Sequence, residues 1–256
     1  MPVTIDLSGR TALITGATGQ LGRVMARTLA AAGADIAVHY NSNSRQADEL
    51  VAEIEAMGRR AFAMQADVGE RDSVNALRDG VLAFLGAPHI VVANAVSQIH
   101  PWSTVLEEDP ADYEDQFRTC VMQNVFLAKA FVPAMVERRG GRYIGINTEC
   151  AMQLKERQSA YAAAKRGMDG VLKVLAREVG PHQVTVNEVA PGWTVSDKDR
   201  EAGTERSEAY ESTVALRRRG TDQEIANAVL FLASDLSSFI TGAYIPVCGG
   251  NVMPAI

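Results

Sequence analysis

The sequence predicts an α/β domain in which a doubly wound, mostly parallel seven-stranded sheet carries helices on both faces. Short apolar runs suited to buried strands alternate along the chain with longer segments whose apolar residues recur at helical spacing. This alternation is typical of parallel βαβ units. With 256 residues the chain suits a single domain, because one hydrophobic core can still grow to that size.

The first strand, turn and helix carry the most informative motif. The apolar run 12–14 is followed by a glycine-containing turn at 15–19 and then by a helical pattern that ends at Gly33. Free N–H groups and the helix dipole converge at such a turn and favour an anion there. The context matches a Rossmann-type dinucleotide fingerprint, although many glycine turns bind nothing. The predicted cofactor contacts in this unit are Gly16, Thr18, Gly19, Gln20 and Leu21, with Gly22 allowing close helix packing.

The other elements follow in order. Further strands are expected at 35–40, 60–65, 89–93, 143–147, 184–189 and 243–248, and further helices at 47–57, 74–85, 110 onward, 159–180 and 221–232. Asp109 and Pro110 open the long helix as N-cap and first-turn proline. We expect a cofactor half at about 1–145 and a catalytic half at about 146–256, with the polar segment 193–213 as a lid.

Composition excludes several classes of protein. The net charge of −6 gives no support for nucleic-acid binding, and no apolar stretch is judged long enough to cross a membrane. Residues 1–10 have no signal-peptide pattern. The three cysteines lie far apart without CxxC spacing, so we expect reduced thiols, no metal site and a cytoplasmic location.

The end of the second strand indicates the choice of cofactor. Ligands of open α/β sheets bind at the carboxyl edge, where an NAD site would place an acid for the ribose hydroxyls. The acid of this strand, Asp35, lies at its wrong end. An ordinary polar loop is the alternative, but the residues favour a 2′-phosphate and therefore NADP over NAD: Tyr40, Asn41 and Ser42, with Arg23 and Arg45 nearby.

Two later strand ends add candidates. Asp67, followed by Val68, could accept a hydrogen bond from the adenine amino group, or it could simply cap the next helix. Asn94 could border the adenosine ribose. In the loop that follows, His100 could line the pocket, although an isolated loop histidine is more often solvated.

An amide lies on the apolar face of the long helix. Asn124 shares that face with Phe117, Val121 and Ala128. A buried amide without partners would be costly. Asn124 therefore either caps a neighbouring backbone group or belongs to a polar network at the site.

The helix expected at 159–180 places a phenol beside an ammonium group. Tyr161 and Lys165 lie one turn apart on the same face. A neighbouring ammonium favours the phenolate, which predicts a lowered pKa for Tyr161 and a role in proton transfer. A core tyrosine with a snorkelling lysine is the alternative.

The loop before this helix is polar and could meet the substrate. Its charges over 153–158 would suit a hydroxylated or charged substrate, and solvation explains them equally well. Trp102 and Trp193 could wall the pocket or could simply pack in the core. We therefore take Glu149, Gln153 and Trp193 as candidate substrate contacts.

Taken together, these motifs resemble the short-chain dehydrogenase/reductase family over essentially the whole chain. The match is to its shorter, single-domain branch, and it is most similar to the 3-oxoacyl-(acyl-carrier-protein) reductase and sugar-dehydrogenase members. The residues that carry it are TGATGQLG at 15–22, Asp67-Val68, Asn94-Ala95, Asn124, Thr148, Tyr161-Ala-Ala-Ala-Lys165, and Val186-Asn187 running to Pro191-Gly192. The resemblance implies an NAD(P)-dependent enzyme that interconverts a ketone and a secondary alcohol.

The resemblance also implies a role for each residue. Tyr161 would be the general acid or base, and Lys165 would lower its pKa and hold the nicotinamide ribose. Thr148, where the family normally has serine, would polarise the substrate oxygen, and Asn124 would hold a water in a proton relay. The residues expected to border the nicotinamide carboxamide are Pro191, Gly192, Thr194 and Ser196.

Three residues depart from the family pattern. Gln20 stands where the second glycine is usual, Val96 replaces the glycine after Asn94-Ala95, and Asn147 replaces the first of two serines. These changes bear on cofactor affinity more than on catalysis.

Two other functions stay open. A non-redox dehalogenase or isomerase on this fold is disfavoured by Lys165 and Gly16, because similar cofactor-free dehalogenases have arginine for the lysine and lack the glycine turn. A catalytically silent cofactor-binding regulator is disfavoured by the intact Tyr161–Lys165 pair. The expected partner is a small carbonyl or alcohol, without nucleic acid or membrane. The two long helices pair subunits in resembling enzymes, so a homotetramer, or a dimer, is expected.

Overall fold

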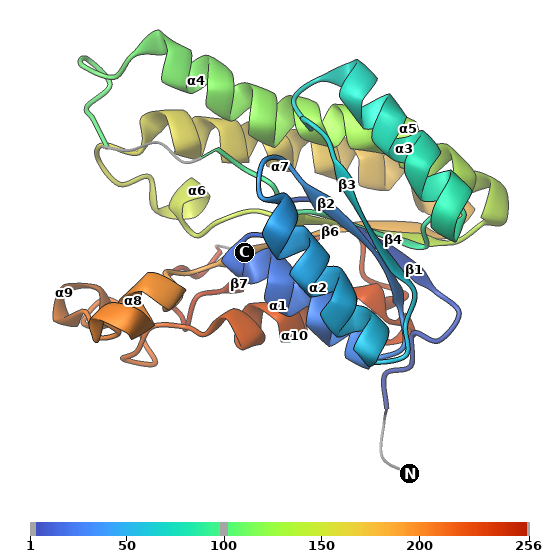
Figure 1. Cartoon of the computed structure of the whole chain (residues 1–256). Helices are drawn as coiled ribbons and strands as arrows, with labels where there is room; N and C mark the ends of the chain where they lie inside the picture. The colour runs from blue at the N-terminus through green and yellow to red at the C-terminus, as the bar shows by residue number, and fades with distance from the viewer. Residues whose placement is uncertain (1–3, 98–101, 255–256) are drawn as a thin grey trace.

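A computed structural model describes residues 4–97 and 102–254 and confirms the predicted doubly wound sheet (Figure 1). Its seven strands lie in the order β3-β2-β1-β4-β5-β6-β7, and every neighbouring pair is parallel. The strands are β1 (Thr11–Ile14), β2 (Asp35–Tyr40), β3 (Ala61–Gln65), β4 (Ile90–Ala93), β5 (Gly141–Ile146), β6 (Val184–Pro191) and β7 (Tyr244–Val247).

Helices cover both faces of the sheet, as Figure 1 shows. One layer holds α1 (Gln20–Ala31), α2 (Ser44–Ala56) and α10 (Asp222–Ala233), and the other holds α3 (Arg71–Leu85), α4 (Pro110–Phe117), α5 (Gln123–Arg138) and α7 (Ser159–Val179). Strands buried on both faces need apolar residues at every position rather than at alternate ones. In β1, accordingly, Ile14 packs in the core under α1 and α10, while its neighbour Leu13 packs in the core under α3 and α5.

The long helix contains a π-helical turn that the sequence pattern did not predict. This turn, Arg118–Met122, separates α4 from α5 and adds a residue to the helical repeat. The extra residue rotates the face that meets the core, so Phe117, predicted to be buried, is 51% exposed. Gln116 is fully buried instead, whereas Asn124 is fully buried as predicted.

The same helical stretch corrects the expectation about membrane-spanning segments. Over 29 residues, Pro110–Arg138 is long and apolar enough to cross a membrane by length and composition. Half of the most apolar stretch of this segment is buried inside the domain, and core helices of soluble proteins share this property. Packing against the sheet therefore accounts for much of its apolar character.

Short helices occupy the segment 193–213. They are α8 (Asp197–Ala202) and α9 (Glu208–Glu211), and Figure 1 places them beyond the ends of β6 and β7, beside α1. A further short helix, α6 (Cys150–Gln153), follows β5. The segment predicted to be a lid is therefore folded and lies beyond the carboxyl ends of β6 and β7.

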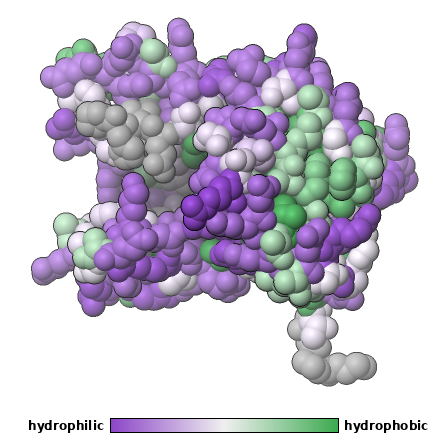
Figure 2. Space-filling model, in the orientation of Figure 1, coloured by the Kyte–Doolittle hydropathy of each residue, from purple (hydrophilic) through white to green (hydrophobic). Residues whose placement is uncertain are grey.

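The surface beside α3 carries an apolar area, on the right in Figure 2. On α3, Phe84, which is 67% exposed, stacks on Phe62 of the edge strand β3 with ring centroids 4.9 Å apart. This stacking joins α3 to the edge strand.

Candidate active site

The glycine turn brings three chain segments close together. Gly16 has φ +61°, and a Cβ there would lie 3.0 Å from the Cα of Ala95 at the end of β4. A Cβ on Gly22 would collide with the Gly16 carbonyl oxygen. The turn therefore depends on glycine at both positions, for its backbone conformation and for the close approach of α1.

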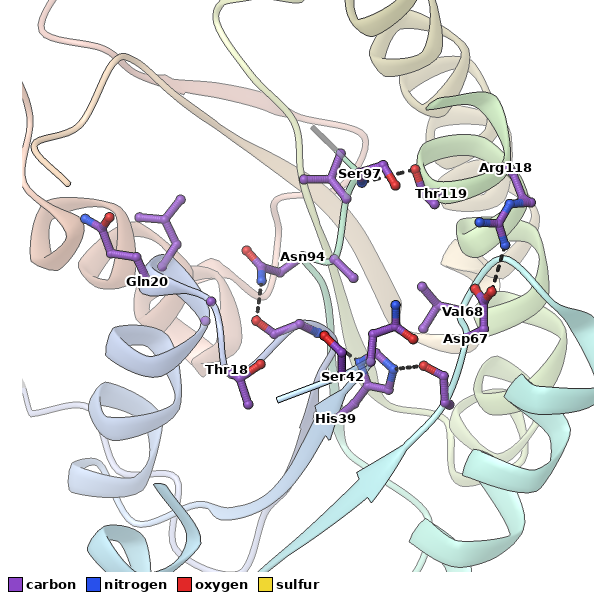
Figure 3. Close-up of a pocket in the computed structure, with 18 of the residues that line it drawn as sticks. Thr18, Gln20, His39, Ser42, Asp67, Val68, Asn94, Ser97, Arg118 and Thr119 are labelled. Carbon is purple, nitrogen blue, oxygen red and sulfur yellow. Dashed lines mark hydrogen bonds and ion pairs between the residues drawn. The ribbon is translucent and has the colours of Figure 1, made fainter. Parts of the chain in front are cut away.

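This turn borders an open cavity of about 530 Å³ at the carboxyl ends of β1, β2, β3 and β4. Figure 3 shows Gln20 at one end of the cavity and the Arg118–Asp67 pair at the other, with Asn94 between them. The predicted cofactor residues that line it are Gly16, Thr18, Gly19, Gln20, Leu21, Asn41, Ser42, Asp67, Val68, Asn94, Thr194 and Ser196. Trp193, a predicted substrate contact, also lines it, whereas Tyr40, Tyr161, Lys165, Pro191 and Gly192 do not.

Buried polar side chains that the sequence analysis missed hold these strand ends together. The Thr15 hydroxyl accepts the backbone N–H of Asn94 at 2.9 Å and donates to the side-chain oxygen Oε1 of Gln123 at 2.7 Å. Gln123 in turn donates to the Ala95 carbonyl at 2.8 Å. Asn94 donates from its amide to the Thr15 carbonyl at 2.9 Å. These hydrogen bonds join β1, β4 and α5 and thereby fix the shape of the cavity.

His39 supports the glycine turn from β2. Its Nδ1 accepts the Gly16 N–H at 2.9 Å, and its Nε2 lies 3.0 Å from the Ala66 carbonyl oxygen, so the neutral ring with a proton on Nε2 satisfies both contacts. Burial lowers the pKa of His39 to about 4. The ring is therefore neutral at pH 7.

Asp67 faces the cavity and does not cap α3, whose N-cap residue is Glu70. Its carboxylate accepts the Gly69 N–H at 2.8 Å and an Arg118 hydrogen bond at 2.9 Å. Burial opposes ionisation, but these two donors outweigh it and hold the pKa of Asp67 below its usual range. The helix-cap alternative is thus wrong for this residue.

The arginines expected near a 2′-phosphate are engaged elsewhere. Arg23 lies 2.5 Å from Asp197 of α8, and Arg45 lies 2.9 Å from Glu49 one turn along α2. Neither lines the cavity, whereas Asn41 and Ser42 do. Asp35 is paired with Arg60 at the opposite end of β2.

The predicted catalytic side chains meet where β5 ends and α7 begins. The Thr148 hydroxyl lies close enough to the Tyr161 phenol to affect its pKa, and it accepts the Cys150 N–H at 3.2 Å. Lys165 is 3% exposed, and its Nζ lies 5.8 Å from the centre of the Tyr161 ring and donates to the Ile146 carbonyl at 2.6 Å. The geometry groups a hydroxyl, a phenol and a buried ammonium at one strand end.

The predicted lowering of the pKa of Tyr161 is wrong in this structure. Burial of the phenol raises its pKa, and the neighbouring thiols of Cys120 and Cys150 add to this, whereas the nearby Thr148 hydroxyl opposes it. At 5.8 Å from the ring centre, the Lys165 ammonium does not offset these effects. The phenol is therefore protonated at neutral pH.

Asn124 is fully buried and has partners for both ends of its amide. Its Nδ2 donates to the Cys120 carbonyl in the π-helical turn at 2.6 Å, and its Oδ1 accepts the Tyr143 hydroxyl at 2.8 Å. Backbone capping, one of the two roles left open by the sequence, is present. The π-helical turn is the local structure that it stabilises.

Glu149 and Trp193 meet through a third side chain on the lid. Glu149, 4% exposed, accepts the Tyr210 hydroxyl at 2.9 Å and the Asn251 amide at 3.0 Å. The backbone N–H of Trp193 donates to the same Tyr210 oxygen at 2.9 Å. Burial raises the pKa of Glu149, while the two hydrogen bonds lower it.

The other predicted residues lie nearby. Gln153 ends α6, and Gly192 has no room for a Cβ because Tyr210 and Cys248 close over it. The ring of Trp102 lies 5.9 Å from that of Tyr161, so this tryptophan stands beside the phenol. His100 lies outside the described residues.

The sequence matches known families over nearly its whole length. A family model described as enoyl-(acyl carrier protein) reductase matches residues 16–251. The 3-oxoacyl-(acyl-carrier-protein) reductase FabG of Staphylococcus aureus is 34% identical over 244 residues, 95% of this chain and 98% of that protein. The L-rhamnose 1-dehydrogenase (NAD(P)(+)) of a Sphingomonas species is 32% identical over 247 residues, 95% of this chain and 96% of that protein.

Solved structures agree with these matches. A blue fluorescent protein from a metagenomic library, in complex with NADPH, superimposes with a TM-score of 0.90 at 33% identity, covering 97% of this chain and 100% of that one. A 7α-hydroxysteroid dehydrogenase with NADH and 7-oxo glycochenodeoxycholic acid gives 0.87 at 29%, covering 97% and 96%. The chain therefore belongs to the short-chain dehydrogenase/reductase family of NAD(P)-linked oxidoreductases.

Proposed function

We propose that the protein reduces a ketone to a secondary alcohol, and catalyses the reverse oxidation, with NADP as its preferred cofactor. The observation that carries the proposal is the cluster of Thr148, Tyr161 and Lys165 at the end of β5. A cavity that can take a dinucleotide opens at the same edge of the sheet. When bound, the nicotinamide supplies or accepts the hydride, and the protein handles the proton.

The raised pKa of Tyr161 suits the reductive direction. A phenol that stays protonated at neutral pH can donate its proton to the carbonyl oxygen as that oxygen gains negative charge. The Thr148 hydroxyl, which lies beside this phenol, would polarise the same oxygen. The buried Lys165 ammonium would stabilise the phenolate left behind and hold the ribose hydroxyls. Asn124 would support the proton relay from the π-helical turn.

The end of β2 supports the preference for NADP. Among the described residues that line the cavity, the only carboxylate is that of Asp67, and Arg118 pairs with it. Asn41 and Ser42 provide amide and hydroxyl groups just before the N-terminus of α2, where backbone N–H groups favour a phosphate. The blue fluorescent protein with NADPH supports this choice, while the 7α-hydroxysteroid dehydrogenase with NADH represents the other cofactor.

We propose that the substrate enters between Tyr161 and the lid. Glu149, Gln153 and Trp193 would bound this side of the site, together with Trp102. A small carbonyl compound or alcohol is the expected substrate class, as for the L-rhamnose 1-dehydrogenase relative.

The outer face of α5 and α7 supports a homotetrameric or dimeric assembly. It forms an apolar groove lined by Val125, Val132, Val171 and Val174, with Lys129, Glu137 and Glu178 at its margin. Val174 is 56% exposed in the single chain. A second copy would bury this face, and its acids and lysine could pair across a two-fold axis. The three free cysteines support a cytoplasmic location.

Titration with NADPH and NADH, followed by nicotinamide fluorescence, tests the cofactor assignment. Tighter binding of NADPH would support it, and equal or tighter binding of NADH would overturn the preference. If neither binds, the non-redox enzyme becomes the better explanation. Binding without turnover in a broad screen of carbonyl compounds and alcohols would favour the silent regulator.

Tyr161→Phe separates the catalytic role of the phenol from binding. We expect turnover to fall by about 10²- to 10⁴-fold, the usual contribution of a positioned general acid, with unchanged NADPH affinity. Tyr113→Phe is the matched control, because its hydroxyl bonds Ser159 near the start of the same helix. Equal turnover in Tyr161→Phe and the wild type would contradict the mechanism.

A further inference from the structure

Helix α7 continues the line of Tyr161 and Lys165 with a second pair of charged side chains. Asp169 and Lys173 follow Lys165 at intervals of four residues, so all lie on one side of the helix. Lys173 Nζ lies 2.9 Å from Asp169 Oδ1 and donates to Oδ2 at 3.1 Å. Asp169 Oδ1 is nevertheless buried without a hydrogen bond of acceptable geometry.

A glutamate of β6 faces this helix from the sheet. Glu188 is 2% exposed and pairs with Gly145 of β5. A Cβ built on Gly145 would point at Leu172 and Met168 of α7 and would lie 3.7 Å from Glu188 Cγ, so the Glu188 side chain is on the α7 side of the sheet. Its carboxyl group contacts that of Asp169. A proton on Glu188 supplies the hydrogen-bond donor that Asp169 Oδ1 lacks. Two ionised carboxylates could not share this contact without repulsion.

Glu188 also reaches the catalytic residues through Asn147, one of the departures from the family pattern. The Asn147 amide nitrogen donates to Glu188 Oε2 and, at 3.1 Å, to the Lys165 carbonyl. The amide oxygen of Asn147 accepts the Thr148 N–H at 2.8 Å. The orientation of Asn147 thus fixes the backbone of two predicted catalytic residues, and Glu188 fixes Asn147.

We propose that Glu188 is a positioning residue of the active site, which holds Asn147, Thr148 and Lys165 in place while it shares one proton with Asp169. The inference rests on the proposed function for its catalytic consequence, but the shared proton does not depend on that function. Neither Glu188 nor Asp169 touches the predicted cofactor cavity, so neither is assigned a direct chemical role.

The surroundings of Glu188 shift its pKa into the pH range in which the folded protein can be studied. Burial raises the pKa of Glu188 to about 8; the Asn147 hydrogen bond opposes this, the Asp169 carboxyl adds to it, and the Lys165 ammonium opposes it. The other charged or titratable groups on the surrounding elements are Lys173 of α7, beside Asp169, and Tyr244 of β7, whose pKa Glu188 helps to raise. Above about pH 8 the proton leaves to solvent and the two carboxylates repel each other.

The sign of the stability effect follows from this shift. A carboxyl group with an ordinary value of 4.5 in the unfolded chain and about 8 in the folded protein contributes stability below pH 4.5. That contribution is lost as the pH rises towards 8, and then stays lost. Glu188→Gln has the shape of the protonated acid but does not titrate, so it lacks this dependence.

Melting temperatures of the wild type and Glu188→Gln, measured from pH 5 to 9 without cofactor or substrate, test the shared proton. We expect the wild-type value to fall relative to that of the variant up to about pH 8, and the difference to be constant above it. Parallel curves would overturn the proposal. Asp169→Asn removes the second carboxylate, so its pH-dependent fall should end at a lower pH than in the wild type. Glu55→Gln, at an exposed position of α2, is the control and should follow the wild type.

The pH dependence of carbonyl reduction tests the positioning role. The wild type should lose kcat from about pH 8, whereas Glu188→Gln should retain it to the higher pH at which Tyr161 itself ionises. Identical profiles would overturn the positioning role even if the melting curves differ. Failure to find any reductase activity would count against the proposed function and leave the melting experiment as a separate test of the proton pair.

Discussion

Gln20, at the start of α1, donates a hydrogen bond to the Val195 carbonyl at 2.7 Å and so joins the glycine turn to the lid. Its amide nitrogen also lies 3.3 Å from Asp222, and the adjacent Arg23 pairs with Asp197 of α8. Glycine, the residue usual at this position in the family pattern, has no side chain and could make neither of the two Gln20 contacts. The departure therefore gives the segment 193–213 a fixed anchor beside the cavity.

Gln20→Gly should loosen this anchor. The loss of one hydrogen bond costs about 1 kcal/mol, so we expect NADPH to bind about fivefold more weakly, because Trp193, Thr194 and Ser196 of the lid line the cavity. Nicotinamide fluorescence measures the affinity, and limited proteolysis should cut 193–213 faster. Gln223→Ala, which removes exposed contacts with Thr28 and Asn227, is the control. Unchanged affinity and proteolysis in Gln20→Gly would contradict the anchor.

The sequence predicted the sheet and the glycine turn because both depend on local patterns. Apolar runs separated by helical periods identify βαβ units, and β2 has the predicted bounds, Asp35–Tyr40. The π-helical turn at Arg118–Met122 was not predicted, because one extra residue in a helix leaves the average period almost unchanged. Phe117 was consequently placed on the wrong face.

The buried polar residues that hold the site together were harder to predict than the residues expected to contact cofactor and substrate. His39, Gln123 and Glu188 lie in segments with otherwise suitable apolar patterns, and their partners are distant in sequence. A polar residue at a position that the pattern assigns to the core was the available signal, and it was used only for Asn124. The wrong pKa direction for Tyr161 has a similar origin, since helical spacing predicts the neighbour Lys165 but not the burial of the phenol.

Stability should fall on the acid side because of His39. Its pKa is about 4 in the folded protein against 6.5 ordinarily, so the neutral ring contributes stability above pH 6.5 that is lost as the pH falls towards 4. The full shift corresponds to about 3 kcal/mol. Urea unfolding between pH 4 and 7 should show this loss in the wild type, and His39→Gln should lack it. Since Glu188 acts in the opposite direction over part of this range, the difference between wild type and variant isolates the histidine. Equal slopes for both proteins would be evidence against a buried neutral ring.

The apolar groove on α5 and α7 should control assembly. Val174→Glu places a charge in the lining of the groove, which a second subunit would have to desolvate, so the mass by light scattering should fall below that of the wild type. Leu82→Glu is a matched control, because Leu82 is 42% exposed on α3, away from this groove. A wild-type mass equal to one chain would overturn the expected assembly, and an unchanged mass for Val174→Glu would exclude this groove as the interface.

The Tyr210 hydroxyl should set how firmly the lid closes over the substrate side. In Tyr210→Phe the Glu149 carboxylate loses the Tyr210 donor but keeps the Asn251 hydrogen bond, and the backbone N–H of Trp193 loses the Tyr210 oxygen as an acceptor. A hydrogen bond to a charged group contributes about 2 kcal/mol, so the variant should be less stable by about that amount at pH 7. The lost donor should also raise the pKa of Glu149 further, because burial is then opposed by fewer hydrogen bonds.

This prediction separates the lid contact from the chemistry. The lid contact acts on substrate binding, so KM for the carbonyl compound should rise in Tyr210→Phe while kcat changes less, the reverse of the pattern expected for Tyr161→Phe. Tyr113→Phe, which loses a hydroxyl near the start of α7, should leave KM unchanged. A fall in kcat alone would show that Tyr210 acts on the proton-transfer step rather than on closure.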